Sequence, residues 1–143
     1  MKNIIEKGLN LYKKNKEVIN YLFFGGVTTI ICLVVYYILT FTVLDPNVPV
    51  CLQIANIISW IVGVVFAYIT NRKYVFVSKN ENILKEIKSF VIARILTLIL
   101  DMLIMFVGVT LLKGNDKILK LISQVLVIVS NYVLSKLFVF KKK

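Results

Sequence analysis

The residues best suited to chemistry in this chain are cations that stand where long apolar runs end. Arg72 and Lys73 follow one such run, and Lys136 closes a later one. Arg94 lies about one turn inside the start of another. Lys and Arg bind phosphate groups, and the planar guanidinium of Arg can contact two oxygens at once. The four cations predict a site for the phosphate of a lipid, with Lys136 as its weakest member, although membrane topology alone would also use such cations.

Polar side chains within the apolar runs are the second notable feature. Asp101 lies near the centre of the third run, where a carboxylate costs about 2.5 to 3.5 kcal/mol to insert. Intramembrane polar residues face protein or a cavity rather than lipid. We expect the amides of Asn56, Gln124 and Asn131 to bind this carboxylate, whose role is then structural rather than one in proton coupling. The predicted polar cavity is lined by Asn56, Asn71, Asp101, Gln124 and Asn131.

Groups needed for most enzymatic chemistry are missing from the sequence. It has no His, the commonest metal ligand and general base, and no glycine-rich phosphate loop followed by Lys and Ser or Thr. Cys32 and Cys51 lie in or beside apolar runs and are interpreted as small apolar residues rather than as a disulfide framework. We therefore predict no catalytic residue, no metal and no cofactor, and we expect the protein not to be an enzyme.

Length and composition indicate the elements that carry these residues. The chain has 143 residues, of which 59% are apolar and 17% charged. It contains four runs long enough to cross a bilayer, whose core of about 30 Å needs about 20 apolar residues in a helix. We predict an all-α polytopic membrane protein in which four transmembrane helices form two tandem helical hairpins. Residues 1–143 form a single membrane domain, with helices at about 19–44, 50–70, 90–112 and 118–140.

Two further helices are expected on the membrane surface. Residues 1–17 place apolar side chains on one face and lysines on the other, which predicts an interfacial helix. Asn3 and Glu6 fit a capping box at its start. A second interfacial helix, capped by Asn80, is expected to lead into the third span.

Pairs of small residues four positions apart predict where helices pack closely. Gly25 and Thr29 form such a pair in the first span, and Gly63 and Ala67 form another in the second. Small side chains at this spacing let a neighbouring backbone approach. Both pairs are therefore expected at helix–helix contacts.

The distribution of cations predicts the orientation in the membrane. Fourteen Lys and Arg residues lie in the N-terminal segment, in the loop between the second and third spans, and at the C-terminal end. The other side has Lys113, Lys117 and Lys120. By the positive-inside rule, both termini are cytoplasmic. The net charge of +11 then suits anionic membrane lipids rather than nucleic acid.

The end of the second span is repeated at the end of the fourth. Residues 71–76 read NRKYVF and residues 135–140 read SKLFVF, 64 positions later. We call these segments the first exit and the second exit. Arg72 aligns with Lys136, and aromatic residues follow both, as they do at membrane–water interfaces. The two exits are therefore expected to be related parts of one architecture.

The two exits, the early motif FGGVTT at residues 24–29 and Asn131 together resemble the GtrA-like family of small four-helix membrane proteins. The resemblance covers about residues 18–141, and the branch that serves teichoic acid is the nearest for so lysine-rich a chain. The family pattern has Asn before the basic residue at both exits, whereas this chain has Ser135 at the second. The second exit therefore departs from the pattern at one position.

The resemblance implies a role beside polyprenyl-phosphate glycosyltransferases in decorating O-antigen, teichoic acid or another cell-envelope polymer. It implies translocation of an undecaprenyl-phosphate-linked or similar polyprenyl-phosphate-linked sugar across the cytoplasmic (inner) membrane. The expected partners are that lipid-linked sugar, membrane lipids and a membrane glycosyltransferase, and a homodimer is plausible because four helices enclose little volume.

Two alternative functions stay open from the sequence. One is a non-transporting membrane partner that docks or stabilises the glycosyltransferase. The other is a small proton-coupled exporter, which is disfavoured because the first span carries no carboxylate.

Overall fold

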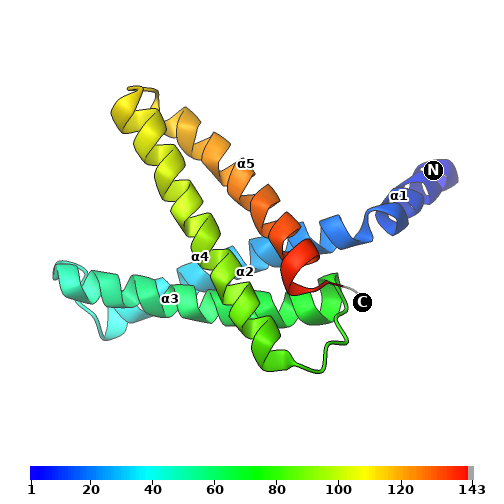
Figure 1. The fold of residues 1–143 in the computed structure, drawn as a ribbon, viewed down its shortest axis with the longest axis horizontal. Coiled ribbons are helices and arrows are strands. Elements are labelled where there is room, and N and C mark those ends of the chain that lie inside the picture. The colour runs from blue at the N-terminus through cyan, green and yellow to red at the C-terminus, as the bar shows by residue number, and fades with distance from the viewer. Residues whose placement is uncertain (142–143) are drawn as a thin grey trace. The chain divides into compact units, whose positions relative to one another are not determined.

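The computed structural model describes residues 1–141, except the side chain of Asp116, and consists of helices joined by short connections (Figure 1). Along the chain these are α1 (Lys2–Lys14), α2 (Lys16–Thr42), α3 (Pro49–Thr70), η1 (Asn71–Val75), α4 (Ile83–Met105), η2 (Phe106–Leu111), α5 (Asp116–Leu134) and η3 (Ser135–Val139). The η segments are π-helical turns, in which an N–H donates to the carbonyl five residues earlier. Each of them directly continues an α-helix.

Four stretches of the described chain are long and apolar enough to cross a membrane. They are Lys16–Thr42, Pro49–Val75, Ile83–Leu111 and Lys117–Val139. Many of their large apolar side chains are exposed, as expected for helices that contact lipid tails rather than a soluble core. The prediction of an all-α membrane protein with four spans is confirmed.

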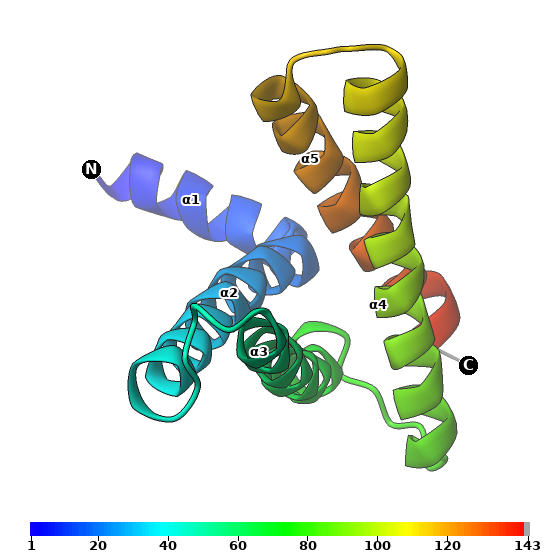
Figure 2. The same cartoon turned by 90° about the vertical axis from the view of Figure 1, so that its left-hand side faces the viewer.

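The chain divides into two compact units, Met1–Val77 and Ser78–Lys143. In the first unit, α2 and α3 pack side by side, and in the second unit α4 and α5 do so (Figure 2). A short turn joins the two helices of each pair. Each unit thus contains one hairpin that returns the chain to the side from which it started, which confirms the predicted tandem hairpins.

The start of α1 differs from the prediction. The helix begins at Lys2, and the N–H of Ile5 donates to the carbonyl of Met1 at 3.2 Å. Asn3 and Glu6 therefore lie inside the helix, and no side chain caps it. The predicted capping box is wrong, because that motif requires Asn3 to stand just outside the helix.

The start of α4 also differs. A separate interfacial helix capped by Asn80 is not formed, because α4 runs without interruption from Ile83 into the membrane span. Asn82 caps it by accepting from the N–H of Lys85 at 3.1 Å, while Asn80 accepts from the N–H of Asn82 at 3.0 Å. No Gly or Pro interrupts α4, so no residue favours a break between a surface helix and a span.

The α2–α3 contact is very close at Gly63. A Cβ atom added to Gly63 would collide with the Sγ atom of Cys32, and both Gly63 and Ala67 are buried. This pair packs as predicted. Gly25 and Thr29 are exposed, and among the described residues no atom lies within 4 Å of a Cβ built on Gly25. The α2–α3 contact therefore does not involve the Gly25 pair, and its packing against another helix stays a prediction.

Candidate functional site

The two exits have the same pattern of buried residues. The buried positions are the first, fifth and sixth: Asn71, Val75 and Phe76 in the first exit, and Ser135, Val139 and Phe140 in the second. This spacing follows from a π-helical turn, whereas an α-helix would bring the first, fourth and fifth residues together. The N–H of the sixth residue donates to the carbonyl of the first, at 2.9 Å in the first exit and 2.8 Å in the second. The repeated sequence is thus a repeated local structure.

Aromatic side chains of α2 hold the first exit in place. The ring centres of Tyr21 and Phe76 are 6.5 Å apart, and the ring of Tyr74 stacks on that of Phe24 at 5.3 Å. The ammonium of Lys73 lies 5.3 Å from the centre of the Tyr74 ring, within cation–π range. These contacts fix the height of the first exit relative to the start of α2.

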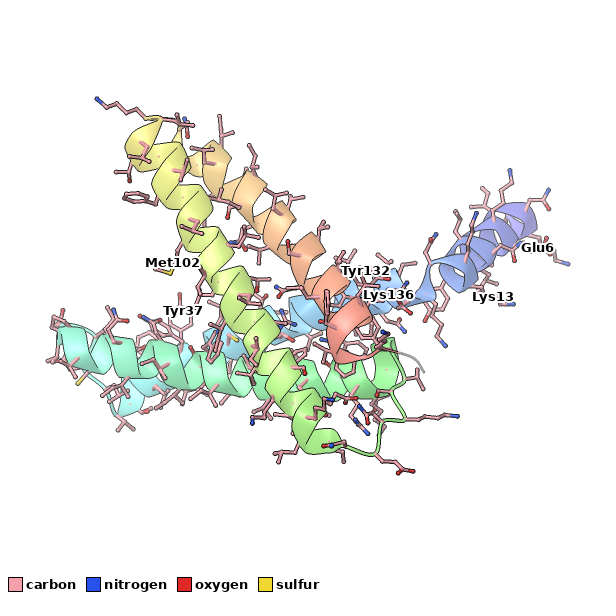
Figure 3. The ribbon with its side chains drawn as sticks, viewed as in Figure 1. Glu6, Lys13, Tyr37, Met102, Tyr132 and Lys136 are labelled. Atoms are coloured by element: carbon pink, nitrogen blue, oxygen red, sulfur yellow. The ribbon has the colours of Figure 1, made fainter. Side chains whose placement is uncertain are left out.

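The second exit is held by α4 in a related way. The rings of Phe90 and Phe140 have centres 5.9 Å apart, and the guanidinium of Arg94 lies 4.9 Å from the centre of the Phe90 ring. Figure 3 shows Lys136 beside Tyr132, and its Nζ atom donates to the Tyr132 hydroxyl at 3.4 Å. Arg94 therefore belongs to the same end of the second hairpin as Lys136.

Of the cations predicted to bind phosphate, Arg72 and Lys73 lie in the first unit, and Arg94 and Lys136 lie in the second. Arg72 and Arg94 are half-buried, whereas Lys73 and Lys136 are exposed. Coulomb interactions are stronger where water is partly excluded, so the two guanidinium groups can contribute more to anion binding than surface lysines do. The first unit places Arg72 next to Lys73, and the second unit places Arg94 near the second exit.

The amides predicted to line a polar cavity lie in different environments. Asn71 and Asn131 are buried, whereas Asn56 and Gln124 are exposed. The hydroxyl of Thr97 donates to Asn131 Oδ1 at 2.8 Å and ties α4 to α5. Sequence reasoning missed Thr97, and the available signal was a lone hydroxyl within a strongly apolar part of α4.

Two of the partners predicted for Asp101, Gln124 and Asn131, are wrong, and the contact with Asn56, which lies in the other unit, stays a prediction. The Asp101 carboxylate accepts from Lys120 Nζ at 2.7 and 3.0 Å and from Ser123 Oγ at 2.6 Å, rather than from the amides of Gln124 and Asn131. The side chain of Asp101 is 19% exposed and that of Lys120 is 48% exposed. Lys120 lies near the predicted outer end of α5, and a carboxylate inside the span attracts its ammonium strongly. The ion pair compensates Asp101 and joins the two helices.

A second acidic residue escaped sequence reasoning. Glu86 is only 1% exposed, and its carboxylate accepts from Ser78 Oγ at 2.6 Å. It stands four residues before Phe90 and eight before Arg94, so the three share one face of α4. That spacing was the signal available in the sequence. This face of α4 therefore carries a buried acid near the end of the second hairpin at which Arg94 and Lys136 lie.

A family model described as the GtrA/DPMS transmembrane domain matches residues 20–140. The match includes both exits, the last three spans and the first span from residue 20 onward. No solved structure matches the chain. The architecture and the repeated exits are therefore found within a region that one family model describes.

Three relatives are similar over most of the chain. The cell wall teichoic acid glycosylation protein GtcA of Listeria monocytogenes serovar 1/2a is 38% identical over 130 residues, which cover 89% of this chain and 86% of that protein. The uncharacterized membrane protein YwcD of Bacillus subtilis strain 168 is 36% identical over 125 residues, covering 85% and 94%. The protein of the same name, GtcA, from Listeria innocua serovar 6a is 38% identical over 128 residues, covering 87% and 85%.

Proposed function

Because the chain belongs to the GtrA/DPMS transmembrane-domain family, we propose that it serves the glycosylation of a cell-envelope polymer. In this proposal it moves a polyprenyl-phosphate-linked sugar across the cytoplasmic membrane, as a carrier within a single membrane domain and not as an enzyme. Two relatives named for cell wall teichoic acid glycosylation support teichoic acid as the polymer. A membrane glycosyltransferase is the expected partner.

The observation that carries the proposal is the repeated exit with its cations. We propose that the lipid phosphate is held by Arg72, Lys73, Arg94 and Lys136. A phosphate is costly to move into a membrane, and the planar guanidinium of Arg can bind two of its oxygens at once. The half-buried arginines are therefore proposed as the main phosphate ligands, and the exposed lysines as the groups that first attract the head group.

The exposed aromatics of the exits suit the rest of the ligand. Tyr74 and Phe138 occupy the same position in the two exits and are 47% and 69% exposed. An aromatic ring at the interface can contact both a sugar face and an isoprenoid chain. We propose that these rings guide the lipid while the cations hold its phosphate.

The orientation is part of the proposal. With the exits and both termini on the cytoplasmic side, Asn47 in the α2–α3 turn faces outward. A cysteine placed at Asn47, in a chain without its two native cysteines, should react with a membrane-impermeant maleimide in intact cells. Labelling that requires permeabilised cells contradicts this topology.

The translocation step is tested with purified protein in liposomes that contain a labelled short-chain polyprenyl-phosphate sugar. At the start, an external reagent reaches only the labelled lipid in the outer leaflet. With the protein present, the accessible fraction should rise until nearly all of the labelled lipid can be reached. Arg72→Gln or Arg94→Gln should abolish this rise while the protein level stays normal, and Arg94→Lys should restore it in part because the planar fork is lost. Alanines at Lys141, Lys142 and Lys143 together form the matched charge control and should have little effect.

The same assay separates translocation from a docking role. A wild-type protein that leaves the label in its original leaflet, yet restores polymer glycosylation in cells and co-purifies with the glycosyltransferase, contradicts the carrier. That result would assign the protein as the non-transporting membrane partner instead.

A further inference from the structure

Apolar and polar residues are fully separated on the surface of α1. At 3.6 residues per turn, one half of the helix carries Ile4, Ile5, Gly8, Leu9, Leu11 and Tyr12. The other half carries Asn3, Glu6, Asn10 and four lysines. All of α1 is described by the structure, and none of its residues is buried. Such a helix is typical of one that lies in a membrane interface.

The lysines stand at the two edges of the polar half. Lys2 and Lys13 follow one edge, Lys7 and Lys14 follow the other, and Glu6 lies between them. Figure 3 labels Lys13 and Glu6 on this exposed helix. A lysine at such an edge can lay its methylene stem along lipid tails while its ammonium reaches the phosphate layer. Four cations against one anion favour an anionic lipid surface.

The break between α1 and α2 turns the apolar half of α1 toward the side on which α2 lies. Asn15 interrupts the helix with φ −115° and ψ 22°, and the Tyr12 hydroxyl donates to Asn20 Oδ1 at 3.3 Å. In a straight helix these residues, eight apart, would be separated by about 12 Å along the axis. Their contact therefore lies on the inside of a bend. Because Tyr12 stands in the middle of the apolar half, that half faces the side on which α2 enters the membrane.

Asn20 also connects α1 to the first exit. Its Nδ2 atom donates to the backbone carbonyl of Tyr74 at 3.3 Å. The Tyr12–Asn20–Tyr74 chain thus joins the surface helix, the first span and the end of the second span within the first unit. The leaflet of α1 is therefore the leaflet at which the first exit emerges.

We propose that α1 lies flat on this leaflet and binds anionic phospholipid head groups through its edge lysines, with the Tyr12–Asn20 hydrogen bond setting which face it buries. The inference extends beyond sugar-lipid translocation and does not depend on it. It requires only the amphipathic helix, the bend at Asn15 and a lipid surface.

The test uses the full chain in nanodiscs, with Cys32 and Cys51 replaced by alanine and a nitroxide label on a cysteine at Ile5 or at Asn10. These positions lie on opposite halves of α1. In discs rich in phosphatidylglycerol, the Ile5 label should be accessible to oxygen and shielded from a water-soluble nickel chelate, with a several-fold change in their ratio. The Asn10 label should show the reverse. In discs of phosphatidylcholine alone, the difference between the labels should shrink markedly.

Two variants make the test specific. Gln at Lys7, Lys13 and Lys14 should remove the dependence on phosphatidylglycerol, whereas Gln at Lys79, Lys85 and Lys88 removes equal charge elsewhere and should preserve it. Tyr12→Phe should keep α1 at the lipid surface but reduce the contrast between the two labels, because the rotational constraint is lost.

Three outcomes overturn the inference. The first is an Ile5 label that is equally exposed to water in both lipids. The second is a control triple variant that removes the lipid dependence as fully as the α1 variant does. The third is an Ile5 label that is shielded from both reagents. The last result would show that protein, such as a second copy of this chain, covers the apolar half. Failure here leaves the liposome translocation assay unaffected, so the two proposals are tested separately.

Discussion

The two hairpins are alike at their exits. Phe76 packs against Tyr21 in the first hairpin, and Phe140 packs against Phe90 in the second. The angle between the two ring planes is 56° in both pairs. Both exits end in a π-helical turn that buries the same three positions. The likeness therefore extends from the sequence motif to its backbone and to its anchor on the preceding helix.

The hairpins differ deeper in the membrane. Eleven residues after the anchors Tyr21 and Phe90 stand Cys32 in α2 and Asp101 in α4. Cys32 lies against Gly63, so the first hairpin gains from a close approach of its helices. Asp101 binds Lys120 and Ser123, so an ion pair joins the second hairpin. The equivalents of Lys120 and Ser123, 64 residues earlier, are the neutral Asn56 and Ser59.

This comparison suggests which features serve function and which serve packing. The two helices of a hairpin need some contact near the middle of the membrane. Close packing at small residues can supply this contact, and so can an ion pair between the helices. The cationic exit is built twice in the same form, although packing alone would allow many solutions. We therefore propose that the lipid chemistry belongs to the exits and that Asp101 has a structural role.

The largest expected effect tests the likeness of the exits. Phe76 and Phe140 are 2% and 3% exposed, so Phe76→Ala and Phe140→Ala should each lower the free energy of unfolding by about 3 to 5 kcal/mol. Phe138→Ala is the control within an exit, because Phe138 is 69% exposed and should matter little. Steric-trapping measurements in bicelles would give these values. A large loss in only one hairpin would show that the exits are not equivalent.

The next largest effect concerns the packing of the first hairpin alone. Gly63→Leu should lower the free energy of unfolding by up to about 3 kcal/mol, because any side chain there collides with Cys32. Gly25→Leu inserts the same side chain where a Cβ meets no described atom within 4 Å, and it should be tolerated. Cys32→Gly should recover part of the loss caused by Gly63→Leu. A Gly25 variant as unstable as the Gly63 variant would place the close contact elsewhere.

A somewhat smaller effect tests the ion pair of the second hairpin. Lys120→Met strands the Asp101 carboxylate inside the span and should lower the free energy of unfolding by about 2 kcal/mol. Asp101→Asn should be milder, at about 1 kcal/mol or less, because the half-exposed Lys120 can extend to the head groups instead. Polymer glycosylation should persist in the Asp101→Asn strain, whereas its complete loss would indicate proton coupling.

The Asp101–Lys120 pair can also be replaced by the residues that occupy the corresponding positions in the first hairpin. Asp101→Cys combined with Lys120→Asn gives the second hairpin the residues that the first has at these positions. The double variant should be more stable than Lys120→Met alone, since no charge is stranded. A double variant that is less stable would mean that the two hairpins cannot exchange their middle contacts.

The spans and exits were predictable because their signals are local. A run of about 20 apolar residues is sufficient for a span, and two similar hexapeptides identified the exits. The partners of Asp101 were not predictable, because they depend on how α5 is rotated against α4, which an apolar sequence does not specify. Lys120 counts among the predicted outer cations because it lies near a turn, and its long side chain reaches the carboxylate in the span. The π-helical turns were missed because that backbone depends on packing around Phe76 and Phe140, and no known helix signal marks it.

The smallest expected effect concerns the residue that follows the first exit. Val77 has φ 48°, a left-handed conformation that is an outlier for a β-branched side chain. Gly is free of this strain, whose typical size is about 1 to 2 kcal/mol, but it gains more freedom when the chain unfolds. Val77→Gly should therefore raise the free energy of unfolding by a net of about 0.5 to 1 kcal/mol.

The matched control for this change is Val65→Gly, at an exposed position within α3. Glycine in a helix interior should lower stability by about 0.5 kcal/mol, so the two substitutions should have opposite signs. Polymer glycosylation in the Val77→Gly strain adds a second measurement. If stability rises while glycosylation falls, the left-handed residue holds Arg72 and Lys73 in position at the expense of stability, and the first exit then has a constraint that the second lacks. If stability falls, Val77 is not strained in the folded protein.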